Sequence, residues 1–263
     1  MPPRPSTRRS PRRDPAAPSE QPPSYGVAAI VSLVILALYI ATLAPTTAMW
    51  DTSEYIAAAQ VLGIPHPPGN PFFGLIAHVF SILPIGGNAA TRINVLAALC
   101  SAVSAGTWFL VVERVLSVWL PERWQRITGA AAAALLGATA FTVWNQSVVN
   151  EKVYTVSLAF FAIVSWLTVL WCDNPEGRTA DRLLVLIGFL IALGYTNHPA
   201  GFLVAPAVGA AVLLRRPTTL LRWRLLLAIA GVFVIGLTPF AVEPIRAGHF
   251  PAIDVPASSS RTM

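Results

Sequence analysis

Three side chains that could transfer protons or bind a metal ion lie close together early in the sequence. Asp51 and Glu54 are three residues apart, and His66 follows within the string GIPHPPG at positions 63–69. Carboxylates and imidazoles act as general acids and bases in enzymes, and both ligate divalent cations. The spacing of these three residues matches no known metal-binding motif, so we expect no metal cofactor. Proton transfer is the main interpretation of these residues, and a divalent metal stays open as the alternative.

Ordinary structural roles would also explain these residues. The segment from Asp51 to Glu54 has the pattern of a capping box, in which Asp51 would cap a helix over 52–62 and Glu54 would reach back to it. The prolines beside His66 would form a rigid turn after that helix. Such a turn does not require a histidine, and a capping carboxylate can also take part in catalysis, so both interpretations stay open.

The composition is that of a polytopic membrane protein. Of 263 residues, 55% are hydrophobic and only 11% are charged, and the mean hydropathy is +0.62. A soluble domain averages about 25% charged residues. The net charge of +6 comes from arginines clustered between apolar runs, which indicates cytoplasmic loops and not a nucleic-acid partner. Cys100 and Cys172 lie in or beside apolar runs, so the sequence indicates no disulfide or metal framework.

The apolar runs predict an all-α protein with about seven transmembrane helices. They lie near 26–45, 92–112, 127–147, 153–171, 183–214 and 225–242. As one helix, the run 183–214 would be about 48 Å long, whereas the hydrocarbon core of a bilayer is about 30 Å thick. We therefore expect two short helices that meet at Asn197-His198. Irregular backbone at membrane depth must be buried in protein or line a polar cavity.

The apolar segment 71–86 decides the topology. If it does not cross the membrane, the arginines of the N-terminal tail and of the later basic loops all fall on the cytoplasmic side, as the positive-inside rule requires. These are Arg4, Arg8, Arg9, Arg12, Arg13, Arg114, Arg123, Arg126, Arg178, Arg182, Arg215, Arg216, Arg222 and Arg224. We therefore expect 71–86 to be an interfacial or re-entrant helix on the outer face, with the N-terminus inside and the C-terminus outside.

With this topology, polar residues gather on the outer face. They are Asp51, Glu54, His66, Asn145, Gln146, Asn150, Glu151, Tyr154, Asn197, His198, Glu243, Arg246 and His249. Ionisable groups near membrane depth are costly and often mark a functional site, so we expect a site that opens outward. Structural roles stay open here too: a cap at 150–152, a hairpin turn at 197–199, and snorkelling of Arg246 to lipid headgroups.

The motifs between residues 27 and 257 resemble, in order, those of domain-of-unknown-function family 2723. That family is also classed as glycosyltransferase family 117, the protein O-mannosyltransferases of the GT-C superfamily. The most specific match is Trp50-Asp51 with Glu54, followed by LGIPHPPG at 62–69. Weaker matches are RIN (92–94), WNQS (144–147), EKVY (151–154), GYTNH (194–198) and PIRA (244–247).

The resemblance implies a membrane glycosyltransferase with a GT-C-like fold and interfacial helices in its first outer loop. Such an enzyme moves a hexose, here mannose, from a polyprenyl phosphate in the outer leaflet to a hydroxyl by inverting displacement. The acceptor would be Ser or Thr of an exported protein, or a glycan. The partners are thus membrane lipid, the lipid-linked sugar and the acceptor, with no nucleic acid. The donor lipid is a substrate, so no separate cofactor is implied.

Residue roles follow from this reaction. Asp51 would be the general base, and Glu54 would orient the acceptor or be the base itself. His66, His198 and Arg246 would donate hydrogen bonds to the donor phosphate, with Arg246 suited to bidentate contact. The other residues expected to bind the donor and its sugar are Asn150, Glu151, Tyr154 and Asn197.

We expect three parts: a disordered basic cytoplasmic tail (1–25), a transmembrane domain (26–243) whose first outer loop is 46–91, and a short outer segment (244–263). The single lysine among many arginines suggests a bacterial protein, in the cell (inner) membrane. Members of the resembled family continue with further spans, so this chain could be a truncated form without activity. It could also be a transporter or flippase, or an assembly partner, for lipid-linked sugars. A transporter would show internal repeats and a polar path to both faces, and the sequence has no clear repeat.

Overall fold

The computed structural model describes residues 22–47, 51–149 and 152–255. Within these ranges the chain is built of helices, and an isolated β-bridge pairs Ile64 with Asp254. The all-α membrane fold expected from the sequence is confirmed. The helices are α1 (Tyr25–Ala41), α2 (Thr52–Val61), α3 (Pro71–Ile82), α4 (Ala89–Leu116), α5 (Arg123–Thr139), α6 (Phe141–Val148), α7 (Lys152–Asp173), α8 (Gly177–Asn197), η1 (Pro199–Val204), α9 (Ala205–Arg215), η2 (Pro217–Leu221), α10 (Trp223–Gly236), η3 (Thr238–Ala241) and α11 (Val242–Ala247).

Among the described residues, four helices are long and apolar enough to cross a membrane: α4, α7, α8 and the unit Trp223–Ala247 that contains α10 and α11. The bent pair of α5 and α6 makes a fifth span if it is counted as one. Helix α1 and the unit Pro199–Arg215 are apolar but shorter. The seven spans expected from the sequence correspond to these four helices, the bent pair and the two shorter helices. Among the described residues, only the four helices are long enough to cross a membrane without a sharp bend.

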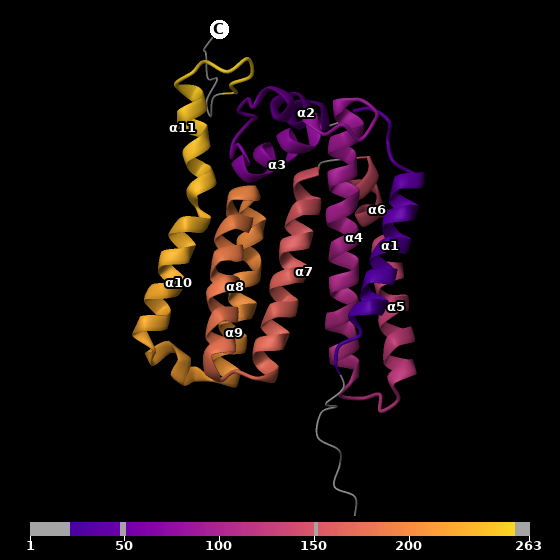
Figure 1. Ribbon diagram of the computed structural model, residues 1–263, viewed down its shortest axis with the longest axis vertical. Coiled ribbons are helices and arrows are strands. Elements are labelled where there is room, and N and C mark those ends of the chain that lie inside the picture. The colour runs from indigo at the N-terminus through magenta and orange to yellow at the C-terminus, as the bar shows by residue number, and fades with distance from the viewer. Residues whose placement is uncertain (1–21, 48–50, 150–151, 256–263) are drawn as a thin grey trace, which may run out of the picture.

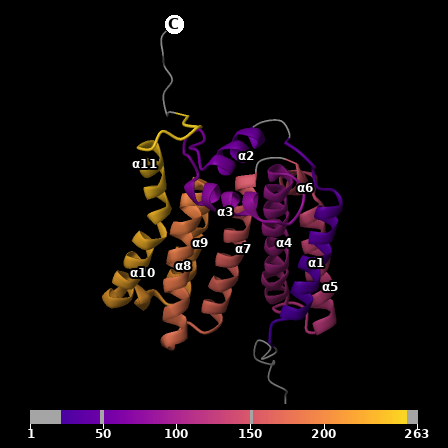
Figure 2. The same cartoon turned by 45° about the horizontal axis from the view of Figure 1, so that its top comes forward.

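The helices form a bundle with two distinct ends, which Figures 1 and 2 show. We call the end where α2 and α3 lie the upper end, and the opposite end the lower end. Helix α3 has 12 residues and lies across the upper end instead of running along the bundle (Figure 2). This agrees with the expectation that the segment 71–86 does not run through the membrane beside the other helices.

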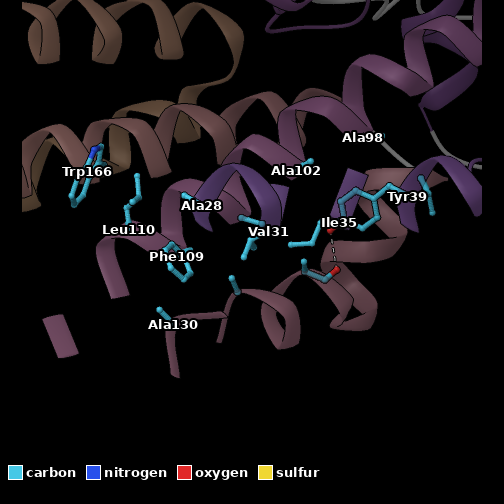
Figure 3. Packing of buried hydrophobic residues seen from close by; sticks show 14 residues of the cluster. Ala28, Val31, Ile35, Tyr39, Ala98, Ala102, Phe109, Leu110, Ala130 and Trp166 are labelled. Atoms are coloured by element: carbon cyan, nitrogen blue, oxygen red, sulfur yellow. Dashed lines mark hydrogen bonds between the residues drawn. The ribbon is translucent and has the colours of Figure 1, made fainter. Parts of the chain in front are cut away.

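The central helix of one half of the bundle is α4, which packs against α1, α5 and α7. Figure 3 shows the buried face of α1, with Val31 beside the side chain of Phe109 from α4 and with Ile35 and Tyr39 further along the helix. The Tyr39 hydroxyl donates to the carbonyl oxygen of Ala138 at 2.9 Å. At Gly106 a Cβ atom would overlap the Ser32 side chain, so α1 and α4 approach more closely than a larger residue would permit.

The predicted break within 183–214 is confirmed. Helix α8 ends at Asn197, His198 has an extended backbone (φ −164°, ψ 141°), and η1 begins at Pro199. Because η1 and α9 turn back along α7 and α8, the break lies at the upper end of the bundle (Figure 1).

The span expected at 127–147 is a bent pair of helices and not one straight helix. The chain bends by 64° between α5 and α6, at Ala140, whose ψ of 133° is not helical. Helix α6 then packs against α4, where the Ser147 hydroxyl donates to the Ser101 hydroxyl at 2.7 Å. Hydropathy cannot show such a bend, because both sides of it are apolar.

The two ends carry different charges, as the arginine pattern predicted. The lower end holds Arg114, Arg123, Arg126, Arg178, Arg182, Arg215, Arg216, Arg222 and Arg224, which lie at or between the helix ends there. The upper end holds α2, the break at His198, and α11, and thus the polar residues expected to share one face. The grouping of these residues at one end of the bundle is therefore confirmed for the described residues.

If the apolar helices cross a bilayer, the two ends of the bundle are expected to lie on opposite sides of it. Single cysteines in place of His249 (upper end) and Arg178 (lower end), with Cys100 and Cys172 changed to Ser, test this. Both target residues are exposed. A membrane-impermeant thiol reagent is expected to label one position in intact cells and the other only after permeabilisation. Labelling of both positions from the same side would contradict the arrangement.

Candidate catalytic site

The site is built on α2 and the turn that follows it. Helix α2 buries Tyr55 and Ala59 against α3, and the Tyr55 ring meets Phe73 edge-on with centroids 5.6 Å apart. The helix ends at Leu62 in the left-handed conformation (φ 50°), and Gly63 N–H donates to the Ala58 carbonyl at 2.8 Å. This left-handed ending turns the chain back along the helix, so that the GIPHPPG string runs beside α2.

His66 lies between the carboxylates of Glu54 and Asp51. Its backbone N–H donates to Glu54 Oε1 at 2.5 Å, and its ring Nδ1 lies 3.1 Å from Glu54 Oε2. The other ring nitrogen, Nε2, lies 3.8 Å from Asp51 Oδ2. Since an ionised carboxylate only accepts hydrogen bonds, the contact with Glu54 favours the tautomer with a proton on Nδ1. The structure thus brings together the three residues that the sequence singled out.

The two carboxylates differ in accessibility. The Glu54 side chain is 28% exposed and is bonded twice to His66, whereas the Asp51 side chain is 47% exposed. Asp51 does occupy the N-cap position of α2, but its side chain makes no capping hydrogen bond. Glu54 reaches forward to His66 instead of back to Asp51. The capping-box interpretation is therefore not supported within the described residues.

The same cluster has the donor set of a cation site. One ligand atom from each of Asp51, Glu54 and His66 can be chosen such that all three lie within 4.8 Å of one another. Two carboxylates and one imidazole suit a divalent cation, a geometry that the sequence spacing did not indicate. The contact between Glu54 and His66 also accounts for the cluster without a metal.

Two residues that the sequence did not single out support this cluster. The Tyr55 ring lies 5.5 Å from the His66 ring, centroid to centroid. The buried Asn70 donates from Nδ2 to the Tyr55 hydroxyl at 2.8 Å, and it is the residue just before α3. Only its left-handed backbone (φ 51°), which Asn tolerates better than most residues, could have been expected from the sequence.

Arg246, in α11, contacts the C-terminal end of α2, where the loop that carries His66 begins. Arg246 donates from Nε to the carbonyl of Leu62 at 2.8 Å and from Nη2 to that of Val61 at 3.2 Å. A guanidinium at the C-terminal end of a helix satisfies free carbonyls and complements the helix dipole. The structure thus places Arg246, expected as a phosphate ligand, against the end of α2.

A backbone pairing and a close contact add to this attachment. Ile64 N–H donates to the Ile253 carbonyl at 2.8 Å, and Val255 N–H donates to the Ile64 carbonyl at 3.1 Å. The carboxylate of Glu243 lies directly against Gly69. Its Oε1 atom is buried and has no hydrogen-bond partner among the described residues.

A second polar group lies at the break between α8 and η1. The buried Asn197 donates from Nδ2 to the Val153 carbonyl at 3.0 Å and to the Ser157 hydroxyl at 2.9 Å. These bonds tie the break to α7, while the Oδ1 atom of Asn197 is buried and has no hydrogen-bond partner among the described residues. The His198 ring packs edge-on against Tyr154 with centroids 5.0 Å apart.

His198 is poised as a neutral hydrogen-bond donor. Ala200 N–H donates to its Nδ1 at 3.1 Å, which leaves the proton on Nε2. Burial lowers the pKa of the His198 imidazole from its ordinary value, because desolvation disfavours the charged form. Asn150 and Glu151, expected in the same pocket, lie outside the described residues. No hydrogen bond or ion pair within the described ranges joins His198 to the cluster around His66.

A comparison with known proteins identifies relatives that match the segment containing Asp51, Glu54, His66 and His198. The family described as "Protein O-mannosyl-transferase TMEM260 N-terminal domain" matches residues 51–221. The chain is 27% identical over 221 residues to the protein O-mannosyl-transferase TMEM260 of Mus musculus, with 81% of this chain and 29% of that protein covered. It is 26% identical over 232 residues to the protein O-mannosyl-transferase tmem260 of Dictyostelium discoideum, with 81% and 27% covered. The chain thus spans less than a third of the length of these relatives. No solved structure matches it.

The contact of Glu243 with Gly69 gives a prediction with a matched control. Gly69 and Gly86 both have positive φ (79° and 83°), but a Cβ at Gly86 would meet open space. Gly69→Ala and Gly86→Ala therefore carry similar backbone strain, and only the first also crowds the Glu243 carboxylate. Gly69→Ala is expected to lower the free energy of unfolding by about 1 kcal/mol more than Gly86→Ala.

This difference is measured by unfolding in mixed detergent micelles. Adding Glu243→Ala to Gly69→Ala is expected to remove the excess cost. Equal destabilisation by the two glycine substitutions would show that the Glu243 carboxylate does not lie against Gly69.

Proposed function

The chain belongs to the TMEM260 N-terminal domain family of protein O-mannosyl-transferases, and from this premise we propose that it transfers mannose from a polyprenyl-phosphate donor to a Ser or Thr hydroxyl of an exported protein. The observation that carries the proposal is the exposed carboxylate of Asp51 beside His66 and Glu54, at the end of the bundle where a membrane-embedded donor meets water. The relatives' names favour a transferase over a transporter, a flippase or an assembly partner.

The proposed reaction is a one-step inverting displacement of the GT-C type. The acceptor hydroxyl oxygen attacks the anomeric carbon, the bond from that carbon to the phosphate oxygen breaks, and polyprenyl phosphate leaves with the electron pair. Asp51 takes the hydroxyl proton. Because Asp51 is the more exposed carboxylate and Glu54 is engaged by His66, Asp51 is better placed as the base and Glu54 as a positioning residue.

The leaving phosphate needs donors aimed at its developing charge. The Nε2–H of His198 suits this role, because Nδ1 accepts from Ala200 N–H and the proton of the neutral ring therefore lies on Nε2. His66 is the second proposed donor, through Nε2–H of its protonated form, because the Nδ1–H already faces Glu54. Arg246 enters the proposal mainly through its hydrogen bonds to the end of α2, and its other guanidinium N–H groups are the proposed phosphate donors. The proposed sugar contacts are Tyr154, Asn197, Asn150 and Glu151.

The proposed setting is the cell membrane of a bacterium, with the lower end in the cytoplasm and the upper end outside. The arginines gathered at the lower end support this orientation through the positive-inside rule. In this proposed orientation the Asp51 cluster lies at the outer face of the membrane, where an exported protein could reach it.

Substitution of the two carboxylates tests the mechanism. In a transfer assay from polyprenyl-phosphate mannose to a Ser/Thr peptide, Asp51→Asn is expected to lose about 10²- to 10⁴-fold in rate, because the base is removed while size is kept. Glu54→Gln is expected to lose less, since its amide oxygen can still accept from His66 N–H. Glu122→Gln, an exposed carboxylate at the lower end, is the control and should keep full activity.

The assay is read together with thermal unfolding of each variant. A folded Asp51→Asn protein with near wild-type transfer would rule out Asp51 as the base. A smaller loss for Asp51→Asn than for Glu54→Gln would reverse the two roles.

A further inference from the structure

The first turns of α4 contact both ends of the loop that carries the proposed catalytic residues. This loop, residues 44–87, lies between α1 and α4, and its described parts are 44–47 and 51–87. Arg92, Ile93 and Asn94 are consecutive in α4, so their side chains leave the helix about 100° apart. The side chains of Arg92 and Asn94 therefore point to nearly opposite sides of α4, and none of the three residues has a role in the proposed reaction.

Asn94 holds the start of the loop. Its Nδ2 donates to the carbonyl of Ala44 at 2.7 Å and to the carbonyl of Thr46 at 3.3 Å. The Asn94 side chain is fully buried. Because a buried amide is costly unless it is hydrogen-bonded, packing alone would favour an apolar residue at this position. The two bonds to the loop thus account for an asparagine here.

Two residues just before Asn94 hold the same segment. Thr91 Oγ1 donates to the carbonyl of Pro45 at 3.0 Å, and Nδ2 of Asn88, the N-cap residue of α4, donates to the same carbonyl at 3.3 Å. The carbonyls of residues 44–46 therefore all accept hydrogen bonds from side chains at the start of α4. These bonds fix the path of the chain shortly before Asp51.

Arg92 holds the other end of the loop. Its Nη1 donates to the carbonyl of Ser81 at 2.8 Å, its Nε to that of Gly86 at 3.1 Å, and its Nη2 to that of Gly87 at 3.1 Å. Ser81 lies in the last turn of α3, where helix carbonyls have no partner within the helix. The planar guanidinium thus joins the end of α3 to the turn that leads into α4, in a fixed geometry that an ammonium group would not give.

Ile93 lies between these two residues in sequence and packs beneath α2 and α3. It is fully buried, in a cluster that includes Ile56 of α2 and Phe73 of α3. Asp51 is the N-cap residue of α2, so the position of α2 sets the position of its carboxylate. Three consecutive residues of α4 therefore hold the start of the loop, the helix in its middle and its end.

We propose that Asn94 and Arg92 are positioning residues for the transfer reaction, which hold the two ends of the loop so that Asp51 keeps a constant place relative to α4. Within the described residues neither forms a hydrogen bond with Asp51, so both act through the loop. A displacement of about 1 Å at a reacting group can lower a rate about 10²-fold. The catalytic part of this inference rests on the proposed function, whereas the hold on the loop does not.

A distance measurement tests the hold on the loop without any substrate. Spin labels are attached to Gln60→Cys in α2 and Val115→Cys near the lower end of α4, in the full chain with Cys100 and Cys172 changed to Ser. Both labelled positions are exposed. Pulsed electron paramagnetic resonance then gives the distribution of distances between α2 and α4, and a single narrow distribution is expected for the chain with Asn94 and Arg92 intact.

The loop variants are Asn94→Ala and Arg92→Lys, and both are expected to broaden the distance distribution. The matched controls are Ser104→Ala and Arg215→Lys. Ser104 donates to the Leu158 carbonyl at 3.1 Å, and Arg215 donates to a backbone carbonyl at 2.8 Å, both outside the loop. Because the controls alter the same kinds of bond elsewhere in the bundle, they should leave the distribution unchanged.

Transfer kinetics separate positioning from binding. With polyprenyl-phosphate mannose and a Ser/Thr peptide, both loop variants are expected to lower kcat about 10- to 100-fold at nearly unchanged KM, because a displaced base affects mainly the transition state. The two controls should keep the wild-type kcat. A higher KM at unchanged kcat would assign the residues to substrate binding and overturn the positioning role.

The distance measurement has its own contradicting outcomes. Unchanged distributions in both loop variants would overturn the proposal, and so would equal broadening in the controls, because the bundle would then have loosened as a whole. If Asn94→Ala does not fold, Arg92→Lys, which keeps the charge, decides by the same two measurements. A wild-type chain without transfer activity would refute the proposed function, while the distances would still decide whether Asn94 and Arg92 hold the loop.

Discussion

The contact of Glu54 with His66 is the interaction on which the upper end of the molecule depends. Glu54 holds the backbone N–H and the ring of the same residue, so it fixes both the path of the loop and the orientation of the imidazole. Because the two residues lie on opposite sides of the turn at Leu62, the contact closes that turn against α2. The orientation of the ring then sets which nitrogen faces Asp51.

The loop is also tied to the far end of the described chain. Arg246 satisfies the last carbonyls of α2, and Ile253 and Val255 pair with Ile64. The segment after α10 therefore supplies part of the framework of a site whose proposed base comes from the segment after α1. If this loop moved during substrate entry, either these hydrogen bonds would break or the segment after α10 would move with the loop.

The sequence predicted those features that follow from periodicity, charge and special residues. The apolar runs predicted the helices, the arginines predicted which helix ends share a side, and the polar residues at Asn197-His198 predicted the break between two helices. It could not predict the bend at Ala140, which depends on tertiary contacts of α6, or the partners of Arg246, which are backbone carbonyls distant in sequence. The three residues of the cluster were recognisable from their types. Their arrangement was not, because Glu54 had an equally good local partner in a capping box.

The most direct test of this account is a double-mutant cycle on the free energy of unfolding with Glu54→Gln, His66→Gln and both substitutions together. Residues in direct contact are expected to show a coupling energy of about 0.5–3 kcal/mol, so the double variant should be less destabilised than the sum of the single variants. Strict additivity of the two substitutions would mean that Glu54 does not hold His66, and the proposed geometry of the site would fall with it.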